Sequence, residues 1–225
     1  MVWNWQHKNW PEFIYSKANF EGFEKKFIEK AGIIQGSLQH IDEAQQEALK
    51  IDLMSDEALK TSEIEGEILN RDSVQSSIRK HFGLQTDHRK IPPAEQGIAE
   101  IMVDLYRNYG KPLNDDILFS WHKFLTNGRQ DLLDIGRYRT HEDPMQVVSG
   151  PLGRSTIHFE APPSAQVTNE MKRFVHWFNE TENQLSALTR AAIAHLHFEC
   201  IHPFEDGNGR IGRAISEKSL SQSLG

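Results

Sequence analysis

Cysteine is almost absent from this sequence of 225 residues, which contains only Cys200. A single thiol cannot form an internal disulfide, so a disulfide-stabilised scaffold is excluded and the sequence agrees with a reducing compartment. We interpret Cys200 as a buried helix residue rather than a redox group. Long apolar runs are also missing, because no stretch approaches the roughly 20 apolar residues of a membrane span. The first 13 residues lack the features of a signal peptide. These absences predict a soluble, cytoplasmic protein with no membrane partner.

The chain also has no excess of positive charge. It contains 25 Lys and Arg against 32 Asp and Glu, which gives a net charge of −7. This balance argues against a general surface for nucleic acid or anionic lipid, because either partner requires a basic patch. We therefore expect no nucleic-acid partner for this portion. The length suits one domain with an N-terminal extension or two small domains, and we favour the first.

Apolar residues recur at helical spacing along most of the chain, which predicts a mostly α-helical fold. Gly83 and Gly110 end two of the predicted helices, Asn114 caps another, and Asp72 or Ser73 is expected to cap the helix that begins near residue 71. The segment 185–201 is apolar nearly all round and should be the most buried helix. The predicted helices lie at about 21–30, 41–70 (as one helix or two), 71–83, 92–110, 114–128, 164–180, 185–201 and from about 209 onwards.

The first 27 residues are rich in aromatic side chains. They suggest either a small packed subdomain that serves as a docking surface, or a cover over one side of the main core, and we favour the cover. These aromatic residues are Trp3, Trp5, Trp10, Phe13, Tyr15, Phe20, Phe23 and Phe27.

Two short β-type runs interrupt the helical pattern, at Gln146 to Ser149 and Thr156 to Phe159, around the turn 150–153. They predict a β-hairpin. It is either a connection between helices or an exposed edge that accepts an extended peptide by strand addition.

An acidic cluster follows the predicted helix 41–70, where Thr61 and Ser62 precede Glu63, Glu65 and Glu67. Acids at a helix C-terminus interact unfavourably with the helix dipole. Taken alone, the cluster is read as a solvated acidic face.

The stretch HPFEDGNGRIGR, from His202 to Arg213, contains the groups of a phosphoryl-transfer site. Pro203 disfavours continuation of the preceding helix, so His202 should lie at its end as a base for a hydroxyl proton. Asp206 is a candidate Mg²⁺ ligand. The Gly-Asn-Gly turn leads into a helix N-terminus that complements anions. Arg210 and Arg213 are three residues apart and could both meet a polyphosphate.

Other sites are less well supported. His195 and His197 point to different sides of a helix and cannot both chelate one zinc ion with His202. The sequence also lacks a Walker GxxxxGK(S/T) loop and the HRD and DFG motifs of protein kinases.

The stretch resembles the signature of the Fic family, HxFx(D/E)GNGRxxR, at every specified position. The likeness extends over about 71–225, and the Trp-rich opening resembles the N-terminal region of a bacterial subgroup. It implies a mostly α fold, with a Fic-type multi-helix core at 71–225, a β-hairpin flap, and a helical N-terminal region at 1–70. That region includes an inhibitory helix at about 55–68.

The implied activity is transfer of AMP from ATP, with Mg²⁺, to a Ser, Thr or Tyr hydroxyl of a target protein or of the chain itself. By this resemblance His202 is the base and Asp206 holds Mg²⁺. Phe204 is a core anchor, the 207–209 backbone and the Asn208 side chain form an anion hole, and the two arginines hold the β- and γ-phosphates. The implied nucleotide-binding set is Phe204, Glu205, Gly207, Asn208, Gly209, Arg210 and Arg213. The flap would bind the target protein through Gln146, Val147, Val148, Ser149, Thr156, Ile157 and His158.

The resemblance also gives the acidic cluster a role. The family's inhibitory helix carries (S/T)xxxE(G/N), which Thr61, Glu65 and Gly66 match, so Glu65 is expected to pair with Arg213 and displace the γ-phosphate. Related proteins usually continue beyond the point that corresponds to residue 225, with another core helix and often a winged-helix domain. We therefore expect the core to be truncated at its C-terminus. Alternatives on the same site are removal of AMP, transfer from another nucleotide, and a non-catalytic partner-binding module. A homodimer is compatible with the resemblance.

Overall fold

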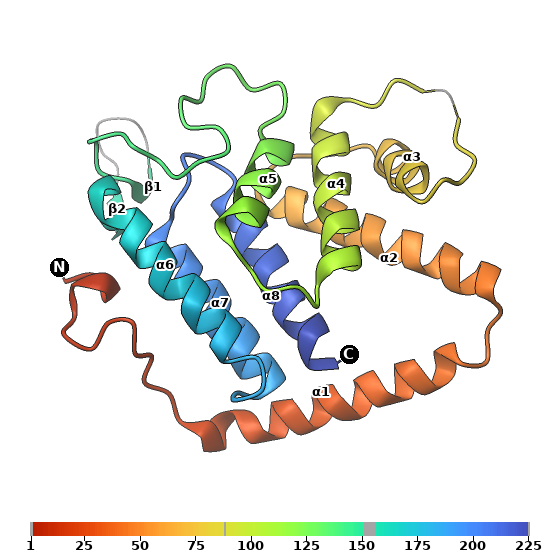
Figure 1. Cartoon of the computed structure of the whole chain (residues 1–225), viewed down its shortest axis with the longest axis horizontal. Helices are drawn as coiled ribbons and strands as arrows, with labels where there is room; N and C mark the ends of the chain where they lie inside the picture. Colours follow the sequence, from red (N-terminus) through yellow and green to blue (C-terminus); the bar gives the residue numbers. More distant parts are fainter. Residues whose placement is uncertain (1, 88, 151–155, 225) are drawn as a thin grey trace.

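Helices dominate the computed structural model, which describes residues 2–87, 89–150 and 156–224. Eight α-helices and one two-stranded antiparallel sheet are present in this part of the chain, so the prediction of a mostly α protein with a β-hairpin is confirmed. Figure 1 shows helix α8 (Asn208–Leu224) at the centre of the molecule. Around it pack α7 (Ala187–Ile201), α4 (Pro93–Asn108), α5 (Asp115–Leu125) and α2 (Glu43–Ile64).

The core is formed by the apolar faces of these helices. Fully buried side chains include Phe174 and Phe178 of α6 (Ser164–Glu180), Phe198 of α7, and Ile211 and Ile215 of α8. Because α8 contributes side chains to this core and begins at the predicted phosphate-binding loop, core packing holds that loop in place.

The predicted helices are present in the structure, but several begin or end at other residues than predicted. The segment 41–70 forms one long helix, α2, which ends at Ile64 before Gly66. Helix α3 (Arg71–His81) is capped by Asn70, whose Oδ1 accepts a 2.9 Å hydrogen bond from Ser73 N. The predicted cap at Asp72 or Ser73 was therefore wrong, because Asn70, which the sequence pattern assigned to the end of the preceding helix, caps α3 instead.

Helix α1 (Lys17–Leu38) is much longer than the predicted 21–30. Gly32 and Gly36 lie within it, and a glycine in a helix interior costs about 1 kcal/mol rather than ending the helix. Figure 1 shows α1 as a long arm at the edge of the molecule, and it contacts α7. Large apolar side chains further along this arm, such as Ile33 and Ile34, are exposed.

Helix α7 is not buried all round, contrary to expectation. Its face towards α8 is covered, but Leu196 on the opposite side is 46% exposed. The apolar composition of α7 does not mean that every side of the helix is buried. Some of its apolar side chains line a cavity of about 540 Å³, together with Phe13, Phe20 and Phe23.

The aromatic opening covers the core in part, as favoured. It includes the short 3-10 helix η1 (Asn4–Gln6). Trp5 Nε1 donates to the carbonyl oxygen of Glu160 at 2.7 Å, and Trp10 Nε1 donates to Glu170 of α6 at 2.7 Å. Trp10 and Phe13 also pack edge-on against the His197 ring. The first tryptophans therefore attach the N-terminal segment to the hairpin, α6 and α7.

The hairpin joins β1 (Gln146–Ser149) to β2 (Thr156–Glu160). Gln146 pairs with Glu160 and Ser149 with Thr156, and the register shifts between Val147 and Val148. The predicted turn at 150–153 falls mostly on residues 151–153, which lie outside the described part. No helix of the described segments is both long and apolar enough to cross a membrane.

Candidate functional site

His202 ends helix α7 in a left-handed backbone conformation, with φ 50° and ψ 60°. Its amide still donates to the carbonyl oxygen of Phe198 at 2.9 Å, and Pro203 follows. A non-glycine residue in this conformation carries a backbone cost, so the surrounding structure must hold it. The predicted position of His202 at the helix end is confirmed.

Arg139 holds this unusual backbone. Its Nε donates to the carbonyl oxygen of His202 at 2.8 Å, and its Nη2 donates to the carbonyl oxygens of Pro162 at 2.6 Å and Ile201 at 3.4 Å. Burial lowers the pKa of Arg139 to about 10, so the guanidinium is still charged at neutral pH. One buried side chain therefore ties the backbone of His202 to the segment that follows the hairpin.

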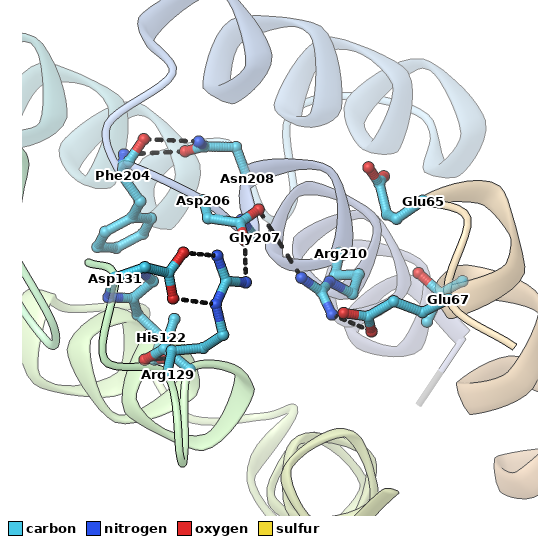
Figure 2. A network of polar contacts seen from close by, with 12 residues as sticks. Glu65, Glu67, His122, Arg129, Asp131, Phe204, Asp206, Gly207, Asn208 and Arg210 are labelled. Carbon is cyan, nitrogen blue, oxygen red and sulfur yellow. Dashed lines mark hydrogen bonds and ion pairs between the residues drawn. The ribbon is translucent and has the colours of Figure 1, made fainter. Parts of the chain in front are cut away.

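The loop 203–207 is closed by Asn208. Its Oδ1 accepts from Phe204 N at 2.9 Å, and its Nδ2 donates to Phe204 O at 2.8 Å (Figure 2). Both polar atoms of the amide thus make hydrogen bonds inside the loop, Asn208 also lines the pocket described below, and its expected part in an anion hole stays a prediction. The amide fixes the loop, and the backbone of 207–209 at the start of α8 is what can face an anion.

Phe204 anchors the loop in the core, as expected. Its ring is fully buried and stacks on His122 of α5, with centroids 4.3 Å apart and an interplanar angle of 10°. His122 Nδ1 accepts a 2.9 Å hydrogen bond from Gly136 N, and burial lowers the pKa of His122 to about 4. A neutral imidazole is therefore part of the packing beneath the loop.

The two acids of the motif have different partners. Glu205 Oε2 accepts hydrogen bonds from the backbone N–H groups of Leu133 at 2.8 Å and Asp134 at 2.6 Å. Asp206 accepts from Gly207 N at 2.6 Å through Oδ1 and from Arg129 Nη1 at 2.7 Å through Oδ2. Glu205 thus holds the loop before the hairpin, while Asp206 lies at the mouth of the site.

Arg129 is itself held in place. Asp131 accepts from its Nε at 2.7 Å and from its Nη2 at 2.6 Å, a bidentate pair that leaves Nη1 for Asp206 (Figure 2). Sequence reasoning missed Arg129, because it lies 77 residues before Asp206 and belongs to no recognised motif.

Both motif arginines meet carboxylates from the end of α2. Arg213 Nη2 donates to Glu65 Oε1 at 2.6 Å, and its Nε donates to Thr61 Oγ1 at 2.6 Å. Arg210 Nη1 donates to Glu67 Oε2 at 2.6 Å (Figure 2). The structure therefore contains the expected pair between Glu65 and Arg213, and adds a second ion pair that the sequence did not predict.

These groups surround a pocket of about 250 Å³, which is lined by Glu65, His202, Asp206, Gly209 and Arg213 among others. Burial lowers the pKa of His202 to about 4, and a hydrogen bond to the Glu199 backbone opposes this shift. Burial also raises the pKa of the Glu199 carboxyl to about 7, which the positive charge of Arg213 opposes. At neutral pH the pocket thus holds a neutral imidazole, the form able to accept a proton.

Of the flap residues named from the sequence, Val147, Val148 and Ile157 are exposed. The hydroxyl of Ser149 lies 2.6 Å from His158 Nε2, and the Gln146 amide donates to Glu160 Oε2 at 2.8 Å. Arg139 connects this hairpin to the pocket, because it also donates to Ser164 Oγ at 2.8 Å just after β2. The described residues contain no cluster of three or more His, Cys, Asp or Glu side chains that could hold a metal ion.

Comparison with known proteins agrees with this geometry. Residues 112–220 match the model of the Fic/DOC family. The chain therefore contains a Fic/DOC domain. Residues 3–84 match a separate domain of unknown function, DUF4172. The matched Fic/DOC segment includes the whole motif, the hairpin, α6 and α7, whereas the inhibitory candidate Glu65 lies in the DUF4172 segment.

Relatives of this Fic/DOC domain include proteins named protein adenylyltransferase. That of Drosophila grimshawi is 34% identical over 99 residues, 42% of this chain and 20% of that protein. The protein adenylyltransferase fic-1 of Caenorhabditis elegans is 35% identical over 110 residues, 48% of this chain and 19% of that protein. The aligned part of the chain therefore spans about a fifth of the length of these relatives.

Solved Fic structures share the fold. The match to C. elegans Fic-1 (residues 134–508) has a TM-score of 0.63 at 22% identity, and covers 92% of this chain and 59% of that one. A Fic domain-containing signaling protein from Bacteroides thetaiotaomicron gives a TM-score of 0.64 at 19% identity, with 87% and 72% covered. At such identities the likeness supports the arrangement of helices and carries no argument about substrates.

Proposed function

We propose that this chain transfers AMP from ATP to a Ser, Thr or Tyr hydroxyl of a protein, and that Glu65 holds it inactive. The main support for this proposal is that the neutral His202 imidazole lies in one pocket with Asp206, the N-terminus of α8 and Arg213. The names of the Drosophila and C. elegans relatives favour the same chemistry.

In the proposed reaction the target hydroxyl oxygen attacks the α-phosphorus of ATP. The bond from that phosphorus to the oxygen bridging to the β-phosphate breaks, and pyrophosphate leaves. His202 takes the hydroxyl proton. The backbone at the N-terminus of α8 faces the developing charge, and Arg210 and Arg213 hold the β- and γ-phosphates.

Asp206 is the residue that would hold Mg²⁺. Mg²⁺ usually binds through one or two carboxylates plus substrate phosphates, so a single carboxylate at the pocket mouth suits it. A carboxylate offers about four lone-pair sites, and Gly207 and Arg129 each donate to one oxygen of Asp206. The ion would neutralise charge on the phosphates.

Inhibition by Glu65 follows from its position. While Nε donates to Thr61 and Nη2 to Glu65, this edge of the Arg213 guanidinium is occupied and is not available to the γ-phosphate. ATP bound without that contact would lack the alignment needed for in-line attack. Gly209 permits this arrangement, since a Cβ there would lie 2.1 Å from Glu65 Oε1.

The target protein is proposed to bind at the hairpin. Val147, Val148 and Ile157 expose apolar surface there, and a two-stranded sheet has edges that can accept an extended peptide.

The test is auto-adenylylation measured with labelled ATP. Glu65→Gly should raise the incorporated label over the parent, and adding His202→Ala should abolish it. Glu63→Gln is the matched control, because Glu63 is exposed and pairs with Lys60 at the surface. Full labelling without His202 would refute its role as the base.

A second reaction on the same site is removal of AMP. It is favoured by the same geometry, since Glu65 lines the pocket that contains His202 and could orient a water molecule. Mass spectrometry of an adenylylated target after incubation distinguishes loss of AMP from its transfer. A Glu65→Gly variant that binds no Mg·ATP in calorimetry would instead indicate a partner-binding module.

A further inference from the structure

Glu67 and Arg210, the residue after the pocket-lining Gly209, form an ion pair at 2.6 Å between Oε2 and Nη1. The Arg210 side chain is only 6% exposed, while that of Glu67 is 37% exposed. Among the residues that the structure describes, the other carboxylate near Arg210 is that of Asp206, whose Oδ1 lies 3.9 Å from Nη2, and Arg210 Nε has no hydrogen-bond partner there. Glu67 is therefore the main counter-charge of a nearly buried guanidinium.

The backbone fixes Glu67 in this position. Gly66 adopts φ +81° just after the end of α2, and Glu67 N donates to Ser62 O at 3.0 Å while Gly66 N donates to Glu63 O at 3.0 Å. This pair of hydrogen bonds is a Schellman motif, in which the glycine reverses the chain. One turn thus places a carboxylate before Gly66 against Arg213 and a carboxylate after it against Arg210.

Each of the two ion pairs occupies an arginine that could otherwise bind a polyphosphate. A buried guanidinium requires an anionic partner, because an unpaired buried charge is strongly unfavourable. Either Glu67 or a phosphate can be the anionic partner of Arg210, and the two compete for the N–H donors of its guanidinium. The inhibitory pattern (S/T)xxxE(G/N), which identifies Glu65, ends at Gly66 and does not include Glu67.

We propose that Glu67 is a second inhibitory carboxylate, which occupies the phosphate-binding position of Arg210 as Glu65 occupies that of Arg213. The proposal rests on the proposed function, in which Arg210 holds the β-phosphate and Arg213 the γ-phosphate of a nucleoside polyphosphate. Each carboxylate then blocks a different phosphate. Release of Glu65 alone leaves the β-phosphate contact blocked.

The test is calorimetric binding of ATP, ADP and AMP to the parent, Glu65→Gln, Glu67→Gln and the double variant. Coupling between competing groups typically changes affinity about 5- to 150-fold. Glu67→Gln should tighten both ADP and ATP on the order of tenfold. Glu65→Gln should tighten ATP more than ADP, because ADP has no γ-phosphate. AMP should bind equally to all variants, which controls for a general loss of negative charge. Glu63→Gln removes a carboxylate from the same segment and should leave the affinity for ADP and ATP unchanged.

An ADP affinity of Glu67→Gln equal to that of Glu63→Gln would overturn the proposal. If Glu67→Gln does not fold, Glu67→Asp provides the test, since it keeps the charge but is one methylene shorter. It should bind ADP more tightly than the parent, and an unchanged ADP affinity would overturn the proposal as well.

The same experiment separates this inference from the proposed function. Tighter ATP binding by Glu65→Gln with no effect of Glu67→Gln rejects only the second carboxylate. Tighter ADP binding by Glu67→Gln, together with no AMP transfer by Glu65→Gly, supports Glu67 as a competitor of phosphate and rejects the transferase activity.

Discussion

The Arg139 guanidinium donates a 2.8 Å hydrogen bond to the carbonyl oxygen of His202, the residue proposed as the catalytic base. The two residues are 63 positions apart in the sequence. Arg139 also donates to the carbonyl oxygens of Ile201 and Pro162, so it binds the end of α7 to the segment after the hairpin. The conformation of the base therefore depends on a side chain outside the motif.

Arg139→Met should destabilise the fold strongly. Three carbonyl oxygens would lose their donor, and an unsatisfied buried acceptor costs about 1–3 kcal/mol, so we expect the free energy of unfolding to fall by about 3 kcal/mol or more. Denaturant unfolding measures this. Lys172→Met, which changes an exposed basic residue of α6, is the control and should have little effect. Equal stability of the two variants would contradict the role given to Arg139.

Gly209→Ala should break the pair between Glu65 and Arg213. The new Cβ would lie 2.1 Å from Glu65 Oε1, and the flexible carboxylate is the group that can move. The measurement is a double-mutant cycle of unfolding free energies with Glu65→Ala, in which residues in contact show coupling of about 0.5–3 kcal/mol. Gly110→Ala is the control, because nothing lies within 4 Å of its added Cβ. Additive effects of Gly209→Ala and Glu65→Ala would show that the clash is absent.

The sequence predicted those features that short segments determine. Helices α4, α5 and α6 have their own apolar stripe and end signals, and the hairpin strands have β-type composition, so local pattern sufficed. The motif residues His202, Asp206 and Arg213 line one pocket. The cap of α3 was missed because the helix-forming composition of 41–70 assigned Asn70 to the preceding helix, which ends at Ile64.

Long-range contacts could not be predicted in this way. Arg129, Arg139 and Glu67 act on residues 77, 63 and 143 positions away, and no periodicity links such partners. The motif also did not predict that the Asn208 amide would bond to the backbone N–H and carbonyl oxygen of Phe204. The domain boundary near residue 70, the homodimer and the cytoplasmic location stay predictions.

The His202 imidazole should remain neutral well below its usual titration range. Burial lowers its folded-state pKa to about 4, against about 6.5 in an unfolded chain. As pH falls below 6.5 the unfolded state gains this proton first, so the contribution of His202 to stability decreases between pH 6.5 and 4. One pKa unit corresponds to about 1.4 kcal/mol.

Two measurements check this expectation. In NMR titration the ring resonances of His202, assigned with His202→Asn, should shift near pH 4. Between pH 6.5 and 4, His202→Asn should also lose less stability than the parent, whereas His7→Asn at the exposed N-terminal segment should behave like the parent. A His202 resonance that titrates at 6.5 or above would contradict the burial argument.

Glu24 of α1 should stabilise the N-terminus of α7. Its Oε1 accepts from Thr189 N at 2.8 Å and Ser186 Oγ at 2.7 Å, and its Oε2 accepts from Leu188 N at 3.2 Å. Ser186, the N-cap residue, makes no cap hydrogen bond with its own side chain. Glu24 therefore satisfies donors that the helix would otherwise leave free, and its charge suits the helix dipole.

Glu24→Gln should lower the free energy of unfolding by about 0.5–2 kcal/mol, the range of a lost helix cap. Burial raises the pKa of Glu24, but the hydrogen bonds from Ser186, Thr189 and Leu188 together lower it below its usual value. The stabilisation is thus present above the unfolded-state pKa and is lost as pH falls through the lowered folded-state pKa. Hydrogen exchange should show faster opening of α1 in Glu24→Gln and no change in Glu21→Gln, which alters an exposed residue of the same helix. Because Glu24 provides the polar attachment of α1 to α7, equal exchange in both variants would mean that apolar contacts alone hold this arm.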